Sequence, residues 1–183
     1  MKLLFALLWT LPGSVQAQAA NPLGRGINLG NALEAPHEGD RGLRIEAGYF
    51  KLIAEAGFDT VRLPIKWSAH ASQKAPYTVS RAFLARVDEI LAQALAQDLN
   101  VILDFHHYDQ MATAPEAHAA RWVGIWRQLA EHYREAPKEV YFDLLNEPNS
   151  TLTDALWNAY LARAVTFVRT SNPTRKLIIG PTG

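Results

Sequence analysis

Apolar and polar positions divide this chain into short and long segments that alternate. The short segments are rich in β-branched and aromatic residues, and they begin about 34 to 40 residues apart. This spacing accommodates a strand, a loop, a helix and a return loop, which predicts parallel strands joined by crossover helices. The five short segments are residues 26–29, 60–63, 100–105, 140–145 and 176–179.

The longer segments between them carry apolar residues at helical spacing. The first ends before Gly57, which is suited to stop a helix, and the second follows Ser80, which is suited to cap one. The last ends at Asn172-Pro173. The apolar positions include Ile45, Phe50, Ile53, Phe83, Leu84, Val87, Ile90, Leu91, Trp122, Ile125, Trp126, Leu129, Leu156, Tyr160, Ala164 and Phe167.

The polar residues indicate which parallel architecture the chain adopts. Gly24-x-Gly26 lies before or at the first strand, so it is a misplaced match to the glycine-rich turn of a dinucleotide-binding fold. Polar and aromatic side chains instead follow several strands, which favours a parallel (β/α)8 barrel of the TIM type over an open doubly wound sheet. These residues are Asn28, Asn31, Trp67, His70, His106, His107, Asn146 and Glu147.

The length of the chain limits how much of such a barrel is present. A complete barrel needs about 250 residues, whereas this chain has 183. We therefore expect an α/β barrel that is truncated after its fifth strand and comprises about the first half of the fold. Without the later strands, the first and fifth strands would be unpaired edges and would favour aggregation.

The N-terminal residues have the pattern of a targeting segment. Lys2 precedes an apolar run over residues 3–11, Pro12-Gly13 breaks that run, and small residues occupy 15 and 17. This arrangement predicts a signal peptide over residues 1–17 and a mature domain over 18–183. We therefore expect a secreted or periplasmic protein that does not remain in the membrane after cleavage.

Composition excludes several classes of function. Lysine plus arginine and aspartate plus glutamate both number 18, so no net field favours nucleic acid or an anionic membrane. The chain has no cysteine, which excludes thiolate catalysis and zinc–cysteine sites.

Glu147 is the strongest candidate for catalysis. The apolar segment 140–145 predicts a buried strand, and Pro148 ends it because proline cannot donate to a sheet. A carboxyl group at the carboxyl end of a barrel strand is placed for acid/base chemistry. For the neighbouring Asn146 to reach the same cleft, the chain must bend or bulge at this point.

Arg62 lies within an apolar strand, where an unpaired charge would be very costly. We expect it either to orient a catalytic carboxylate or to form a structural ion pair with Asp104 or Asp143. The two roles do not exclude each other.

The third strand ends in two histidines. Asp104 and His106 share one face by period-two alternation, and His107 lies on the other. Asp104, His106, His107 and Asp109 could also be metal ligands. A metal site in a barrel would draw further histidine or carboxylate ligands from other strands. The first strand offers Asn28 and Asn31 instead, so we expect no metal ion.

Aromatic residues divide into two groups. Trp67 and Tyr108 follow strands and are candidates to stack on sugar rings at the rim of a cleft, although ordinary packing is the alternative for both. Trp122, Trp126 and Trp157 are predicted to lie in the core.

Four of these segments together resemble glycoside hydrolase family 5, the endoglucanase (cellulase) family. They are residues 25–31 (RGINLGN), 57–64 (GFDTVRLP), 103–108 (LDFHHY) and 144–148 (LLNEP). The resemblance implies a (β/α)8 barrel and retaining hydrolysis of a β-1,4-linked glucan, with no cofactor.

The resemblance also implies roles for individual residues. It makes Glu147 the general acid/base and Asn146 a substrate-binding amide, with Arg62 supporting the nucleophile and His106 binding near the cleaved sugar. Asn31, Trp67, His107 and Tyr108 are expected along the cleft. The family's nucleophilic glutamate follows strand seven, which is absent, so we expect little or no activity from this chain alone.

Other functions remain open from the sequence. A non-catalytic carbohydrate-binding protein would keep the same aromatic and amide cleft, and a β-mannanase or another β-glycanase would share the same motifs. We expect a polysaccharide partner, and a monomer when the barrel is complete.

Overall fold

The structure, a computed structural model, describes residues 21–183. It contains five parallel strands in the order β1-β2-β3-β4-β5, as the periodicity predicts. The strands are β1 (Gly26–Asn28), β2 (Thr60–Ile65), β3 (Asn100–Phe105), β4 (Val140–Asp143) and β5 (Leu177–Ile178). The helices are α1 (Ala47–Glu55), η1 (Trp67–His70), α2 (Arg81–Leu95), α3 (Asp109–Thr113), α4 (Pro115–His132) and α5 (Asp154–Ser171). The predicted signal peptide lies outside the described residues.

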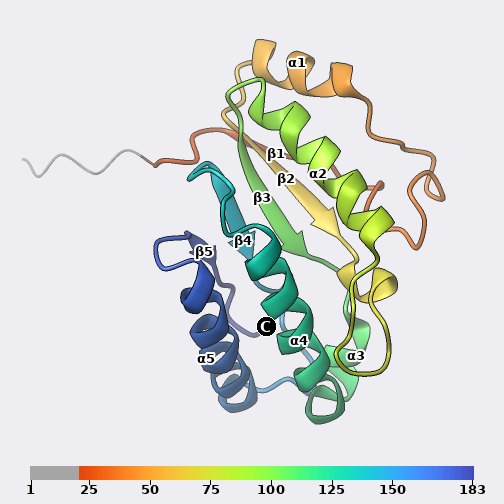
Figure 1. Cartoon of the computed structure of the whole chain (residues 1–183), viewed down its shortest axis with the longest axis vertical. Coiled ribbons are helices and arrows are strands. Elements are labelled where there is room, and N and C mark those ends of the chain that lie inside the picture. The colour runs from red at the N-terminus through yellow and green to blue at the C-terminus, as the bar shows by residue number, and fades with distance from the viewer. Residues whose placement is uncertain (1–20) are drawn as a thin grey trace, which may run out of the picture.

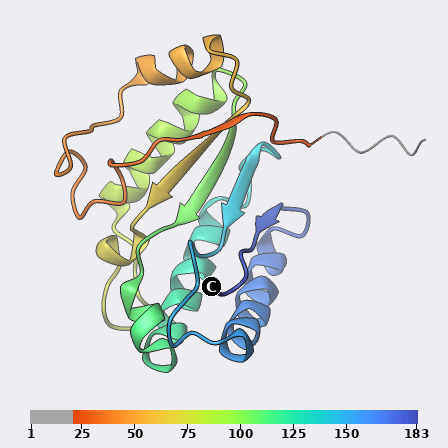
Figure 2. The ribbon, with the colours of Figure 1, turned by 180° about the vertical axis from the view of Figure 1, so that it is seen from behind.

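The helices cover one face of the sheet. Figure 1 shows α2, α4 and α5 in front of the strands, and Figure 2 shows the strands from the opposite side, in front of these helices. The main core lies between the two layers and includes the fully buried Phe50, Ile90, Trp122 and Trp126. Because every strand runs in the same direction, the carboxyl ends of the strands meet at one edge, where the loops gather.

Local sequence signals set the ends of several helices as predicted. The Ser80 hydroxyl accepts a hydrogen bond from the backbone N–H of Phe83 at the start of α2. Gly57 follows α1 with a φ of +78°, a conformation that residues with a side chain rarely adopt, and its N–H donates to the carbonyl of Ala54. Within residues 21–183, no helix combines the length and apolar character needed to cross a bilayer.

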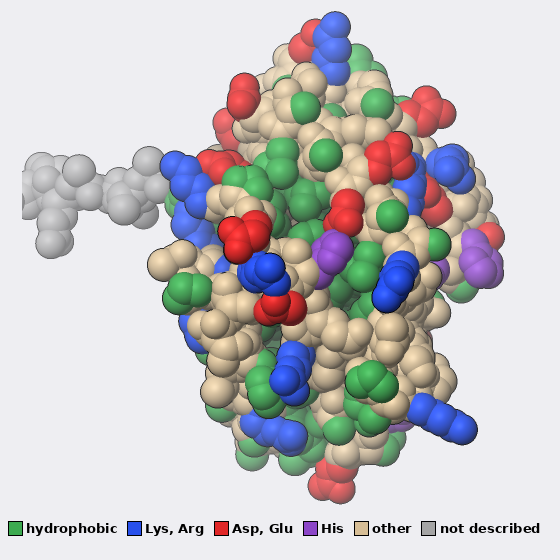
Figure 3. Space-filling model, viewed as in Figure 1, with side chains coloured by type: hydrophobic (Ala, Val, Ile, Leu, Met, Phe, Trp, Pro, Cys, Tyr) green, Lys and Arg blue, Asp and Glu red, His purple; other side chains and the backbone are tan. Residues whose placement is uncertain are grey.

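On the face shown in Figure 3, lysine and arginine side chains are interspersed with aspartate and glutamate side chains. This arrangement agrees with the equal numbers of acidic and basic residues in the sequence.

Candidate active site

The end of β4 is anchored from the helical layer. Regular pairing stops at Asp143, two residues earlier than the sequence predicts. The next carbonyl, that of Leu144, accepts hydrogen bonds from the indole N–H groups of Trp122 (3.0 Å) and Trp126 (2.8 Å). The N–H of Leu144 still donates to the carbonyl of Ile178. The backbone can therefore leave the sheet here without losing its hydrogen bonds.

The chain then turns sharply at the predicted bend. The N–H of Asn146 donates to the carbonyl of Phe105 at 3.0 Å, which holds the end of β4 beside the end of β3. Glu147 has a φ of +45°, and Pro148 follows it. Because of this turn, two adjacent residues, Asn146 and Glu147, both border one cavity.

That cavity has a volume of about 380 Å³ and lies at the carboxyl edge of the sheet, between the loops that follow β3 and β4. Four of the predicted site residues besides Asn146 line it. They are His106, His107, Tyr108 and Glu147. Glu147 is exposed, and no side chain within residues 21–183 donates a hydrogen bond to its carboxylate.

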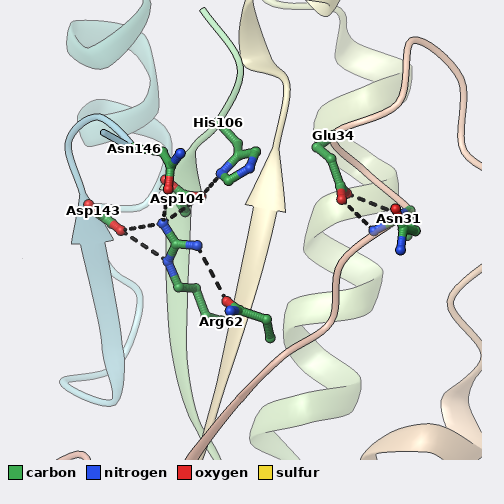
Figure 4. A network of polar contacts seen from close by, with 9 residues as sticks. Asn31, Glu34, Arg62, Asp104, His106, Asp143 and Asn146 are labelled. Carbon is green, nitrogen blue, oxygen red and sulfur yellow. Dashed lines mark hydrogen bonds and ion pairs between the residues drawn. The ribbon is translucent and has the colours of Figure 1, made fainter. Parts of the chain in front are cut away.

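A hydrogen-bond network centred on Arg62 joins four neighbouring strands at this edge (Figure 4). Arg62 donates to Asp143 Oδ2 through Nε (3.1 Å) and Nη2 (2.9 Å). Its Nη2 also lies 2.9 Å from Asp104 Oδ2 and 2.9 Å from Asn146 Oδ1, while Nη1 reaches Asn28 Oδ1 at 3.3 Å. The structural ion pair expected with Asp104 or Asp143 is thus formed with both, and the same guanidinium holds the amide of Asn146.

Asp143 has a raised pKa at this position. Burial raises the pKa of Asp143, and the nearby negative charge of Asp104 raises it further, while Arg62 opposes both effects. The resulting pKa is about 6. One guanidinium therefore does not compensate two buried carboxylates completely.

The alternation predicted after β3 holds for Asp104 and His106 but is wrong for His107, because β3 ends at Phe105 and His107 has a φ of +49°, so both histidines border the cavity. His106 Nδ1 lies 2.5 Å from Asp104 Oδ2, so these two side chains share a face. The imidazole of His107 lies edge-on to that of His106, with ring centroids 4.3 Å apart. Burial makes the largest contribution to lowering the pKa of His107, and the neighbouring His106 lowers it further.

Tyr108 borders the cavity but is mostly buried. Its ring lies roughly parallel to Phe105 at 5.6 Å between centroids, and its hydroxyl accepts a hydrogen bond from Arg121 at 3.2 Å. Burial raises the pKa of this hydroxyl. The structure thus gives Tyr108 a packing role in addition to its position at the cavity.

The prediction that Trp67 stands at the rim of the cleft is wrong for this structure. Its side chain is 0% exposed and packs edge-on against Phe83, with ring centroids 5.6 Å apart. Trp67 begins η1, which turns its indole into the helical layer and away from solvent. The alternative of ordinary loop packing holds instead.

Asn31 lies apart from the cavity, and a neighbour that sequence reasoning missed explains its position. The buried Glu34 accepts hydrogen bonds from the backbone N–H groups of Asn31 and Ala32. Figure 4 shows this pair on the opposite side of β2 from Asp143 and Asn146. The available signal was a carboxylate between the apolar Leu33 and Ala35, three residues after Asn31.

The metal alternative gains no support from the geometry. Among residues 21–183, no group of three or more histidine or carboxylate side chains is arranged to hold a metal ion. Asp104 and His106, two of the four conceivable ligands, are hydrogen-bonded to each other.

Comparison with known proteins identifies the family of this chain. Residues 28–183 match the family model described as cellulase (glycosyl hydrolase family 5). The chain belongs to glycosyl hydrolase family 5. Its structural relatives in this family are TIM-barrel endoglucanases, so the five parallel strands correspond to part of a (β/α)8 barrel.

Three relatives illustrate the match. Endoglucanase H of Acetivibrio thermocellus is 34% identical over 179 residues, which cover 94% of this chain and 20% of that protein. The crystal structure of the endoglucanase Cel5A from Thermotoga maritima is 44% identical, with a TM-score of 0.86. The cellulose synthase subunit Z of Clostridioides difficile is 37% identical, with a TM-score of 0.85.

The chain spans about half the length of these structural relatives. It covers 52% of the Thermotoga Cel5A chain and 53% of the Clostridioides subunit, while 87% and 88% of its own residues are matched.

Proposed function

We propose that this chain forms the first half of the catalytic barrel of a retaining endo-β-1,4-glucanase, with Glu147 as the general acid/base. One observation carries the proposal. Asn146 and Glu147 border the same cavity as His106, and Arg62 holds the amide of Asn146 through a hydrogen bond. A carboxyl group, an amide and an imidazole thus converge at the edge of the sheet where barrel enzymes bind substrate.

In this mechanism Glu147 first protonates the glycosidic oxygen and later removes a proton from the attacking water. A second carboxylate about 5 Å away attacks the anomeric carbon. Asp104 and Asp143 are poorly suited to that role, because both are buried and paired with Arg62. We therefore propose that the 183 residues alone have little or no hydrolase activity.

The names of the relatives support a β-glucan as the substrate. Several are endoglucanases, and Thermotoga Cel5A has been crystallised with cellobiose. The same enzyme has also been crystallised with mannotriose, so β-mannan is the second candidate. We further propose that the protein is exported and that the complete barrel is a monomer.

The role of Glu147 can be tested in a hybrid barrel. The chain would be joined to the part of Thermotoga Cel5A that it does not cover and assayed on carboxymethylcellulose. We expect hydrolysis by the hybrid and a loss of about 10² to 10⁴-fold with Glu147→Gln, as for removal of a general acid. Glu135→Gln, at an exposed glutamate outside the cavity, is the matched control and should retain activity.

Two further measurements sharpen this test. An aryl β-cellobioside with a good leaving group needs little protonation, so azide should restore turnover of the Glu147→Gln hybrid by replacing the activated water. Full carboxymethylcellulose activity in that variant would refute the assignment. Isothermal titration of the chain alone with cellohexaose and mannohexaose compares its affinity for the two substrate classes. Hydrolysis of either oligosaccharide by the chain alone would contradict the proposed inactivity.

A further inference from the structure

Asp104 uses only one of its two carboxylate oxygens. Oδ2 lies 2.5 Å from His106 Nδ1 and 2.9 Å from Arg62 Nη2, so it bridges an imidazole and a guanidinium. Oδ1 is buried and has no hydrogen-bond partner within the described part of the chain. The side chain as a whole is 0% exposed. An orphaned buried oxygen is costly, so this arrangement requires an explanation.

Neutralising Arg62 does not explain it. Arg62 already has Asp143, which receives hydrogen bonds from two of its nitrogens. Asp104 instead adds a second negative charge beside Asp143 and contacts Arg62 through one nitrogen. The contact that Asp143 does not supply is the one to His106.

That contact determines which nitrogen of His106 carries the proton. An ionised carboxylate only accepts hydrogen bonds, so the 2.5 Å contact requires a proton on Nδ1 of His106. The other ring nitrogen, Nε2, has no hydrogen-bond partner within residues 21–183. His106 also borders the cavity that contains Asn146 and Glu147. In the neutral ring, Nε2 is then an acceptor.

We propose that Asp104 is a positioning residue that fixes His106 in the Nδ1–H tautomer, so that Nε2 accepts a hydrogen bond from a sugar hydroxyl. The part of this inference that concerns the sugar rests on the proposed function. The same oxygen ties the imidazole to Arg62, which in turn holds Asn146. Asp104 therefore acts on two substrate-facing groups from a position that no substrate touches.

The tautomer can be measured directly in the 183-residue chain. Long-range ¹H–¹⁵N correlation spectra distinguish the protonated from the unprotonated ring nitrogen. At about pH 8, we expect wild-type His106 to carry its proton on Nδ1. In Asp104→Ala the acceptor is gone, and the proton should move largely to Nε2.

Asp143→Ala is the matched control, because Asp143 contacts Arg62 but not His106. It should leave the proton on Nδ1. The inference is wrong if wild-type His106 carries its proton on Nε2, if Asp104→Ala leaves the tautomer unchanged, or if both variants change it equally. Should Asp104→Ala fail to fold, the wild-type spectrum alone decides.

Binding separates this inference from the proposed function. Titration with cellohexaose should show an affinity at least several-fold weaker for Asp104→Ala than for Asp143→Ala. If the wild-type chain holds the Nδ1–H tautomer but binds neither cellohexaose nor mannohexaose, the proposed function loses support while the assignment of Asp104 to His106 stands. If wild type binds sugar and both variants bind it equally well, the effect on the sugar contact is refuted.

Discussion

At the scale of single residues, Asp104 and Asp143 are the most consequential pair in the chain. They are register partners on β3 and β4, so two carboxylates face each other across neighbouring strands. Like charges in that position repel, and here Arg62 contacts both of them. This geometry explains why burial and the charge of Asp104 raise the pKa of Asp143 to about 6.

The raised pKa of Asp143 makes the stability of the fold depend on pH. Because the pKa is higher in the folded state than in the unfolded state, folding favours the protonated carboxyl. This contribution is complete below about pH 4 and is lost as the pH rises through about 6.

Asp143→Asn should remove this dependence, since an amide resembles the protonated carboxyl. The free energy of unfolding of the variant minus that of wild type should therefore rise by up to about 3 kcal/mol as the pH increases from about 4 to 7. Urea unfolding across this range measures the difference. Asp98→Asn, at an exposed aspartate, provides the control, and a wild-type-to-variant difference that stays constant with pH would contradict the shift.

Single residues also show where sequence reasoning succeeds and where it fails. The pairing of Arg62 with a carboxylate was predictable, because an unpaired charge in an apolar strand would be very costly. The burial of Trp67 was not predictable, since the one-turn helix η1 decides the direction of its side chain. Glu34 was missed because its partners are backbone N–H groups, which leave little trace in a sequence.

At the scale of elements, the long connection between β1 and α1 is fixed to α2 by one fork-like ion pair. Arg86 on α2 contacts Glu38 through Nε and Nη2, both at 2.9 Å, and Nη2 also donates to the carbonyl of Ile45. Glu38 in turn accepts from the N–H of Ile45 at 2.8 Å. Burial tends to raise the pKa of Glu38, but the hydrogen bonds from Arg86 and Ile45 outweigh it and hold that pKa below its ordinary value.

Glu38→Gln should therefore destabilise the chain by about 2 kcal/mol at neutral pH, since it breaks a mostly buried, charge-assisted pair. Glu89→Gln removes the other carboxylate that contacts Arg86. That side chain is 56% exposed against 9% for Glu38, so we expect a loss below about 0.5 kcal/mol. Thermal and urea unfolding of both variants compare them, and equal losses would show that burial does not matter here.

The arrangement of elements was largely readable from the sequence. All five predicted strands have boundaries within two residues of the structure, because each contains a short apolar run. Ser80 and Gly57 mark helix ends for local reasons. The strand β4 ends earlier than predicted. The carbonyl of Leu144 accepts its hydrogen bonds from two indole N–H groups, which are located some 20 residues earlier in the chain.

At the scale of the whole molecule, the sheet has helices on one face and two outer strands. Within residues 21–183, β1 and β5 each pair on one side only. Apolar side chains are exposed near both, with Ile27 at 37% and Ile179 at 45%. Outer strands of this kind offer unpaired backbone groups to other chains.

We therefore expect the isolated chain to self-associate at micromolar concentrations, and Ile27→Lys to weaken this association through charge repulsion at the edge of β1. Leu52→Lys is the matched control, because Leu52 is 63% exposed on α1 and lies outside the strands. Sedimentation velocity measures the association. An equal effect of both substitutions would point to general surface hydrophobicity rather than to the strand edge.

The two tryptophans that meet at the carbonyl of Leu144 have a consequence for how this half of the barrel can diversify. They fix the backbone just before Asn146 and Glu147 from α4, independently of the residues that come afterwards. Changes in the loop over residues 149–152 can therefore leave the backbone before Glu147 in place. Under the proposed function, new substrate preferences can then arise beside Glu147 without displacing its carboxyl group.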